Sequence, residues 1–137
     1  MSKMTIGALA LALSLAQAGG ALAKAPREAA ASAAVQKDFS AFIARFRVAL
    51  KSNDAAAVTG MTKLPFEDDD TDAAHFRTKG YPRIFTPSVR ACIQRNKVFY
   101  DRGDDGNDYV SIFCGEVIFI FSRTQAGFLF TGTHPND

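Results

Sequence analysis

Apolar residues change their spacing along the chain, from a helical period in the first part to a strand period in the last. Six of them recur at steps of one, three or four residues, which places them on one face of an α-helix: Val35, Phe39, Phe42, Ile43, Phe46 and Leu50. After residue 98 the apolar residues alternate or run in short continuous segments, a pattern typical of strands. The order of the two patterns predicts an α+β fold, with N-terminal helices packed on a curved antiparallel sheet, in a single domain over residues 35–137.

Three further helices are expected between the first helix and the sheet. Residues 54–61 form the first of these, and another begins at Ala73, where we expect Gly80 and Pro82 to break it. The last, at residues 86–96, opens with a threonine that can cap it and a proline at the first helical position. Leu64-Pro65-Phe66 is expected to be extended, so three or four helices in all, with this segment between them, precede the first strand.

Four segments predict strands, and they are residues 98–100, 109–114, 117–121 and 128–133. The third is apolar at every position, which indicates a central strand buried on both faces. Residues 101–108 are rich in turn-forming Gly, Asp and Asn, and residues 124–127 turn the chain before the last strand. The strands therefore follow one another as hairpins.

The first 23 residues have the organisation of a secretory signal peptide. Lys3 precedes an uncharged apolar run at residues 6–15, too short to cross a bilayer, and residues 21–23 offer a small-x-small cleavage site. We predict cleavage after Ala23 and a flexible leader over residues 24–34, which can bury little apolar surface. The alternative is an Ala- and Leu-rich helix that belongs to the fold. Export would place the mature protein in the periplasm or outside the cell.

The charge of the mature chain argues against a nucleic-acid or membrane-surface partner. Cleavage removes Lys3 from the 16 Lys and Arg residues, which leaves fifteen against 14 Asp and Glu and a net charge of about +1. No segment after the cleavage site approaches the ~20 apolar residues of a membrane helix. We expect a partner that is a small apolar ligand or a periplasmic protein, with the oligomeric state open and a dimer among the options.

The chain has two cysteines, Cys92 and Cys114. An oxidising compartment favours a disulfide between them, which would join the last helix to the second strand. The alternative is two separate buried thiols. Neither cysteine has the C-x-x-C spacing or the neighbouring histidine expected of a reactive thiol.

Two acidic segments offer the oxygen ligands that Ca²⁺ prefers, but neither has the spacing of a standard calcium loop. The first contains Glu67, Asp68, Asp69, Asp70 and Asp72. In the second, at residues 101–108, Gly103 falls where a ligand is needed. Both segments are interpreted as solvated turns, and neither a metal site nor a cofactor is predicted.

Several short motifs between residues 36 and 133 form a framework of helix and hairpin positions. They are Phe39-x-x-Phe42-x-x-x-Phe46-x-x-x-Leu50, Asn53-Asp54-Ala55-Ala56-Ala57-Val58, Leu64-Pro65-Phe66, residues 76–81, Ile84-Phe85-Thr86-Pro87-Ser88-Val89-Arg90 and Gly115-Glu116-Val117-Ile118-Phe119. In these motifs the chain resembles the nuclear transport factor two-like superfamily, which has a cystatin-like cone as its fold, and in particular its small exported bacterial members. The superfamily includes isomerases, dehydratases, binding modules and partner-recognition domains, so the resemblance selects no activity.

Enzymes of this superfamily place an acid/base residue inside the cone, and no residue of this chain can be assigned to that place. The residues that could line a ligand site at the mouth of the cone are Tyr81, Tyr100, Tyr109 and Glu116. Each also has a structural interpretation, as a half-buried core aromatic or as an exposed turn carboxylate. His75 and His134 are interpreted as surface residues, and the catalytic residues, if any, are unknown.

Three functions follow from these observations. The first is a non-catalytic binding domain that uses the concave sheet or an exposed edge to hold a small ligand or a protein partner. The second is a periplasmic enzyme with a single acid/base residue in the cone. The third is a partner-specific inhibitor or immunity-type protein. A cone filled with Phe side chains would argue against the first two, and an exposed Phe or Tyr patch outside it would favour a protein partner.

Overall fold

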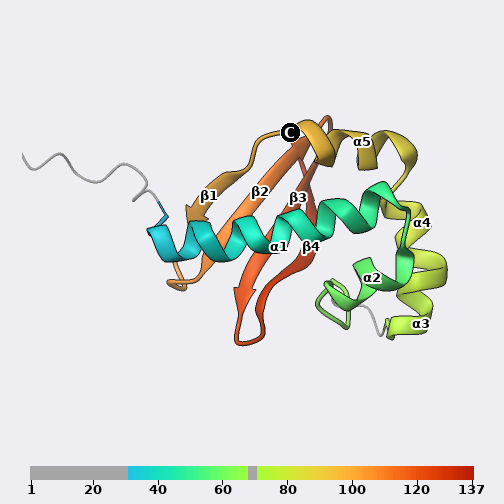
Figure 1. Ribbon diagram of the computed structural model, residues 1–137, viewed down its shortest axis with the longest axis horizontal. Helices are drawn as coiled ribbons and strands as arrows, with labels where there is room; N and C mark the ends of the chain where they lie inside the picture. The colour runs from blue at the N-terminus through green and yellow to red at the C-terminus, as the bar shows by residue number, and fades with distance from the viewer. Residues whose placement is uncertain (1–30, 68–70) are drawn as a thin grey trace, which may run out of the picture.

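Helices precede a four-stranded antiparallel sheet in the computed structural model, which describes residues 31–67 and 71–137 (Figure 1). The helical elements are α1 (Ala33–Lys51), α2 (Ala55–Gly60), α3 (Ala73–His75), the π-helical turn η1 (Phe76–Gly80), α4 (Tyr81–Ile84) and α5 (Pro87–Arg95). The strands are β1 (Phe99–Arg102), β2 (Asp108–Cys114), β3 (Val117–Thr124) and β4 (Gly127–Pro135), in the order β1-β2-β3-β4. The predicted α+β class is confirmed. The signal peptide and residues 24–30 of the leader lie outside the described residues.

The long helix α1 crosses one face of the sheet (Figure 1). Ser32 caps it, because its Oγ accepts a hydrogen bond from Val35 N–H at 3.2 Å, so the helix begins two residues before Val35. The apolar face predicted from the sequence is the buried face, and it consists of Val35, Phe39, Phe42, Ile43, Phe46, Ala49 and Leu50. This face packs against the sheet and forms most of the helical side of the core.

The helix that begins at Ala73 does not break at Gly80 and Pro82, so this prediction was wrong. The chain stays helical because it widens into a π turn, closed by the bond from Tyr81 N–H to Phe76 O. Pro82 follows at the start of α4, where a helix tolerates a residue without an N–H. Gly80 makes room instead of breaking the helix, since a Cβ at this position would lie 3.0 Å from the ring of Phe76.

Strand β3 is central in the sheet, as predicted, but it is buried on one face only. Phe119 and Phe121 point into the core, whereas Ile118 and Ile120, on the alternate face, are only half-buried. The prediction of burial on both faces was wrong because the helices cover one side of the sheet and leave the other without a covering layer among the described residues.

Aromatic rings fill the space between α1 and the sheet. The ring centroids of Phe46 and Phe121 are 5.2 Å apart, and those of Phe39 and Phe121 are 5.6 Å apart. Phe130 from β4 lies 5.7 Å from Phe121, and all four rings are fully buried. The interior of the expected cone is therefore a packed core.

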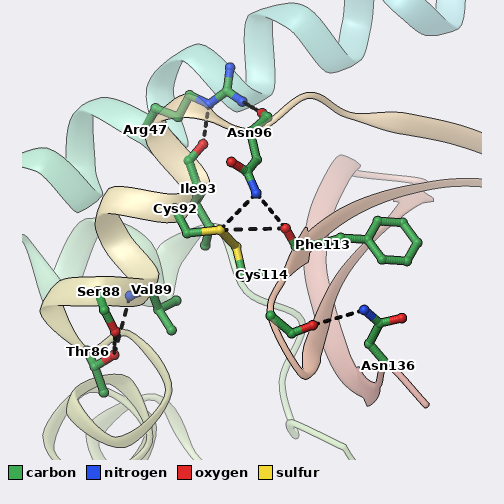
Figure 2. Close-up of a disulfide and its surroundings, with 11 residues drawn as sticks. Arg47, Thr86, Ser88, Val89, Cys92, Ile93, Asn96, Phe113, Cys114 and Asn136 are labelled. Atoms are coloured by element: carbon green, nitrogen blue, oxygen red, sulfur yellow. Dashed lines mark hydrogen bonds between the residues drawn. A yellow bond between two sulfur atoms is a disulfide. The ribbon is translucent and has the colours of Figure 1, made fainter.

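A disulfide joins Cys92 on α5 to Cys114 at the end of β2, with 5.9 Å between the two Cα atoms, which confirms the predicted pair (Figure 2). Asn96, just after α5, adds a hydrogen bond from its Nδ2 to Phe113 O at 2.6 Å. The last helix is thus fastened to the sheet by one covalent and one polar link. In the part of the chain that the structure describes, no helix has the length and apolar character needed to cross a bilayer.

The edge of β4 is closed by the segment that follows α2. Lys63 N–H donates to Phe130 O and Phe130 N–H donates to Met61 O, both at 2.8 Å, so the segment pairs with β4 in parallel. Further along the edge, the carboxylate of Glu67 accepts hydrogen bonds from the N–H of Thr133 and, at 3.1 Å, from its hydroxyl. One of the two edges of the sheet is therefore protected against pairing with another chain.

Candidate partner-binding surface

The sheet face opposite the helices carries an apolar patch. Six of the residues that the pairing register places on this face form what we call the outer-face patch: Phe99, Ser111, Phe113, Ile118, Ile120 and Leu129. The patch spans all four strands, and the same register places Asp101, Tyr109 and His134 on this face beside it. It faces away from the helical layer, so it is the side of the sheet that has no cover among the described residues.

Phe99 and Phe113 are the most exposed members of this patch. Their side chains are 48% and 37% exposed, and their rings meet edge to face with centroids 5.2 Å apart. Val48, on α1, is the remaining large apolar side chain that is strongly exposed in the described part of the chain, at 68%. Two large exposed rings in contact are a feature of interaction surfaces, whereas single exposed apolar residues are common everywhere.

Strand β1 forms the second edge of the sheet, and no described residue pairs with the outer side of this strand. In an antiparallel pair, residues alternate between those that exchange hydrogen bonds with the neighbouring strand and those whose N–H and C=O point away. Gly103 N–H donates to Asn107 O at 2.9 Å, so Gly103 belongs to a hydrogen-bonded pair. Counting back by two, Asp101 and Phe99 also face β2, and the backbone groups of Arg102 and Tyr100 point away from it. The N–H of Arg102 is taken by Asp101 Oδ1 at 2.8 Å. The N–H and C=O of Tyr100 are left without a partner among residues 31–67 and 71–137.

Two surface clefts separate α1 from β1, and both are lined by Tyr100. The larger has a volume of about 580 Å³ and runs between the middle of α1 and residues 94–98. The smaller, of about 240 Å³, lies between the start of α1 and residues 101–102 and 108–109. Together we call them the α1–β1 groove. Of the β1 residues, Tyr100, Asp101 and Arg102 line it.

The two ends of this groove differ in charge. Arg47, Arg95 and Lys97 line the larger cleft, and no carboxylate lines it within the described residues. Arg47 donates from Nε to Ile93 O at 2.9 Å and from Nη2 to Asn96 O at 2.8 Å (Figure 2). These carbonyls hold the guanidinium in place without neutralising it, so this end of the groove is positively charged.

The smaller cleft carries charges of both signs. Asp108 lies 3.8 Å from Arg102 and 3.7 Å from Arg123, and Arg123 also pairs with Asp38 on α1 at 2.6 Å. Asp101 lines the same cleft. This end of the groove is therefore close to balanced in charge.

Tyr81 lies apart from the groove, in the helical end of the molecule. Its ring is buried, and its hydroxyl donates to Asn53 Oδ1 at 2.8 Å. Burial raises the pKa of Tyr81, while the charge of Arg90 acts in the opposite direction. Arg90 Nε is buried without a hydrogen-bond partner among the described residues. The location of Tyr81 matches the structural interpretation of this residue, as a core aromatic.

Tyr100 and Tyr109 both border the smaller cleft, but the register places their side chains on opposite faces of the sheet. Tyr100 packs edge to face on Phe39, with ring centroids 5.9 Å apart. The hydroxyl of Tyr109 donates to Asp105 Oδ2 at 2.6 Å, and this bond raises the pKa of Tyr109 and lowers that of Asp105. Glu116 is an exposed residue of the turn between β2 and β3, at the other end of β2 from Tyr109.

Histidines and carboxylates form no cluster in the described residues. His75 and His134 are both exposed, as expected. No group of three or more His, Cys, Asp or Glu side chains within residues 31–67 and 71–137 could hold a metal ion. Asp68, Asp69 and Asp70 of the acidic segment lie outside the described residues.

The sequence patterns did not predict that these residues form a surface. Phe99 and Phe113 belong to predicted strands, but alternation does not reveal which face of a sheet the helices will cover. Lys97 and Arg47 lie far apart in the chain and meet only because α5 returns beside α1. One signal could have indicated the surface. Val110 and Ile112, which are both buried, alternate along one face of the strand, and Phe113 falls on the opposite face.

No protein-family model, curated protein or solved structure matches this chain. The surface is therefore interpreted from its own geometry and chemistry.

Proposed function

We propose that this chain is an exported, non-catalytic domain that binds a protein partner through the β1 side of its sheet. The observation that carries the proposal is the exposed contact between Phe99 and Phe113, at 5.2 Å, next to an open strand edge. Aromatic side chains at such a surface supply much of the binding energy of protein interfaces.

A protein partner fits better than a small ligand held inside the fold. Binding of a drug-sized molecule needs an interior or cleft of several hundred Å³ that encloses most of its surface. Phe39, Phe46, Phe121 and Phe130 occupy the space where the cone would hold a ligand. The α1–β1 groove is long and open along its side, which suits a chain segment.

The arrangement of the predicted acid/base groups gives little support to an enzyme. Tyr81 is buried at the helical end, Glu116 is in a turn, and Tyr100 and Tyr109 lie on opposite faces of adjacent strands. A catalytic pair needs two groups within hydrogen-bond reach of one reacting atom. We therefore favour binding over catalysis.

Export is part of the proposal. The N-terminal charge, apolar run and small-residue site support a signal peptide, and the disulfide between Cys92 and Cys114 is compatible with an oxidising compartment. The α+β layout is the one implied by the resemblance to the nuclear transport factor two-like superfamily, and membership of that superfamily stays a proposal.

Affinity capture tests the proposed surface. The purified protein, immobilised through a C-terminal tag, is exposed to a periplasmic extract of its own host, and bound proteins are quantified by mass spectrometry. We expect the F99S/F113S double variant to lose at least about 90% of a specifically bound protein, because each exposed aromatic anchor is worth more than about 1 kcal/mol. V48S is the control, since Val48 is also apolar and is more exposed than Phe99 and Phe113, but lies on α1.

Two results would overturn the proposal. One is equal capture by the wild type and by F99S/F113S, with both proteins folded by circular dichroism. The other is turnover of a substrate that is lost in Y81F, Y100F or E116Q while capture is unchanged, since this would return the site to an acid/base residue.

A further inference from the structure

We infer that the partner docks as an extended segment with acidic carboxyl-terminal residues, which adds to the open edge of β1 as an antiparallel strand and lies in the α1–β1 groove. The inference rests on the proposed function, because it names the chemistry of the partner at the same surface.

The backbone of β1 points to strand addition. The sheet has two edges, and the one at β4 is closed by residues 61–63 and by Glu67. At β1, the N–H and C=O of Tyr100 and the C=O of Arg102 face outward, at the two-residue spacing with which a further strand can pair, and antiparallel pairing is slightly the more stable of the two directions. An extended peptide offers alternating N–H and C=O groups that match them, which is the way several peptide-binding domains recognise their ligands.

The groove gives the added strand two sides to contact. Strand residues alternate, so half of the side chains of a docked segment would lie toward α1 beside Tyr100, and the other half beside Phe99 on the outer face. The four residues of β1 span about 13 Å at roughly 3.3 Å per residue. A segment of about five to seven residues would therefore cover the edge and reach the larger cleft.

For an antiparallel strand, charge sets the composition of the segment and the end at which its acidic residues lie. The larger cleft, at the Phe99 end of β1, carries Arg47, Arg95 and Lys97 without a carboxylate in its described lining. A strand that runs antiparallel to β1 brings its carboxyl end to this cleft. Acidic residues and a terminal carboxylate at that end would meet three cations, whereas the mixed charges at the Arg102 end favour neither sign.

Synthetic peptides test this directly. The probe is a heptapeptide with fluorescein at its amino terminus, Thr-Val-Thr-Val-Thr-Glu-Glu, titrated with the purified protein and followed by fluorescence anisotropy. The matched peptides end in Lys-Lys or carry the two Glu residues at the amino end. We expect saturable binding of the first peptide, at least about tenfold weaker binding of both others, and a decline in affinity from about 50 to 500 mM NaCl.

N-methylation of the peptide tests the ladder without changing the protein. One variant is methylated at the first, third and fifth residues and the other at the second, fourth and sixth. Only one of these sets donates to β1, so we expect one variant to bind about tenfold or more weakly and the other to bind within about threefold of the parent peptide. Equal effects of the two sets would contradict strand addition.

The cation cluster is tested with K97E, and with K51E as the control at the end of α1, outside the groove. Both lysines are exposed, so neither change should affect folding. K97E should weaken binding of the Glu-Glu peptide about tenfold and strengthen that of the Lys-Lys peptide, whereas K51E should leave both within about twofold.

The outcomes separate this inference from the proposed function. No saturable binding of any peptide up to about 1 mM overturns the inference. If F99S/F113S still abolishes partner capture in that case, the proposed function stands and the partner uses another shape. If capture is insensitive to Phe99 and Phe113, the proposed function fails, whatever the peptides do.

Discussion

Glu67 accepts hydrogen bonds from both the N–H and the hydroxyl of Thr133, although 66 residues separate them in the chain. This contact closes the edge of β4 near its end, where the pairing with residues 61–63 has already stopped. Among the described residues the sheet is thus protected at β4 and unpaired at the outer edge of β1, and under the proposed function this difference would direct a partner to β1.

Removal of the Glu67 carboxylate should weaken the fold slightly. We expect E67A to lower the free energy of unfolding by about 1 kcal/mol, because two exposed hydrogen bonds to a carboxylate are lost. E67Q keeps an acceptor oxygen and should lose about half as much. Urea denaturation measures both, with E116A as the control, since Glu116 is an exposed turn residue. A loss in E116A as large as that in E67A would contradict the assigned contact.

Loss of the disulfide should cost more. The pair Cys92 and Cys114 closes a loop with a sequence separation of 22, and a loop of this length predicts a stabilisation of about 3 kcal/mol. We expect denaturant unfolding of the C92A/C114A variant to have a lower midpoint than that of the wild type. The free energy of unfolding obtained from the two curves should differ by this amount.

Reductant provides the internal control for the disulfide. Dithiothreitol should lower the unfolding midpoint of the wild type toward that of C92A/C114A and leave the variant unchanged. Because Asn96 also bonds to Phe113 O, at 2.6 Å, α5 should keep part of its attachment to β2 in both cases. If dithiothreitol reduces both cysteines completely and the unfolding midpoint of the wild type does not change, the disulfide has no stabilising role.

The aromatic core should tolerate truncation poorly. Phe121 is fully buried and packs on Phe39, Phe42 and Phe46 of α1. We expect F121A to lower the free energy of unfolding by about 3–5 kcal/mol through lost burial and a residual cavity. V48A, at an exposed position, should stay within about 0.5 kcal/mol of the wild type. Chemical denaturation followed by circular dichroism gives both values, and a small effect of F121A would mean that the core relaxes to fill the space.

Local patterns predicted the elements that depend on neighbours in the chain. Helix α1 follows from the spacing of residues 35–50, and the disulfide follows from there being two cysteines and a proposed oxidising compartment. The continuation of the helix through Gly80 was not predictable in this way, because it depends on how the ring of Phe76 packs against the glycine.

The binding surface depends on information that local patterns lack. Ile118 and Ile120 look as buried as Phe119 and Phe121 in the sequence, and only the placement of the helices decides which pair is covered. In the same way, residues 61–63 pair with the edge of β4 through contacts over more than sixty residues, whereas no described residue pairs with the outer edge of β1. The strands therefore follow from local apolar patterns, whereas the surface follows from contacts between distant segments.

Alkaline pH should destabilise the wild type more than Y81F. Burial raises the pKa of Tyr81, with Asp54 acting in the same direction and Arg90 opposing it, so the tyrosine of the unfolded chain ionises first as the pH increases. Between the two pKa values the folded protein holds the extra proton, and the free energy of unfolding falls as the pH rises. The stabilising contribution is complete below about pH 10 and is lost above it.

Urea denaturation of both proteins between about pH 8 and pH 11 tests this dependence. At neutral pH, Y81F should be less stable by about 1 kcal/mol, because the bond to Asn53 Oδ1 is lost. Above pH 10 the gap should narrow, since the variant has no phenol to ionise at this site. N53G removes the acceptor and suits the left-handed backbone at this position, where φ is 52°. Burial is the largest cause of the shift in the pKa of Tyr81, so N53G should still lose stability steeply at alkaline pH. Parallel curves of unfolding free energy against pH for Y81F and the wild type would contradict the role assigned to Tyr81.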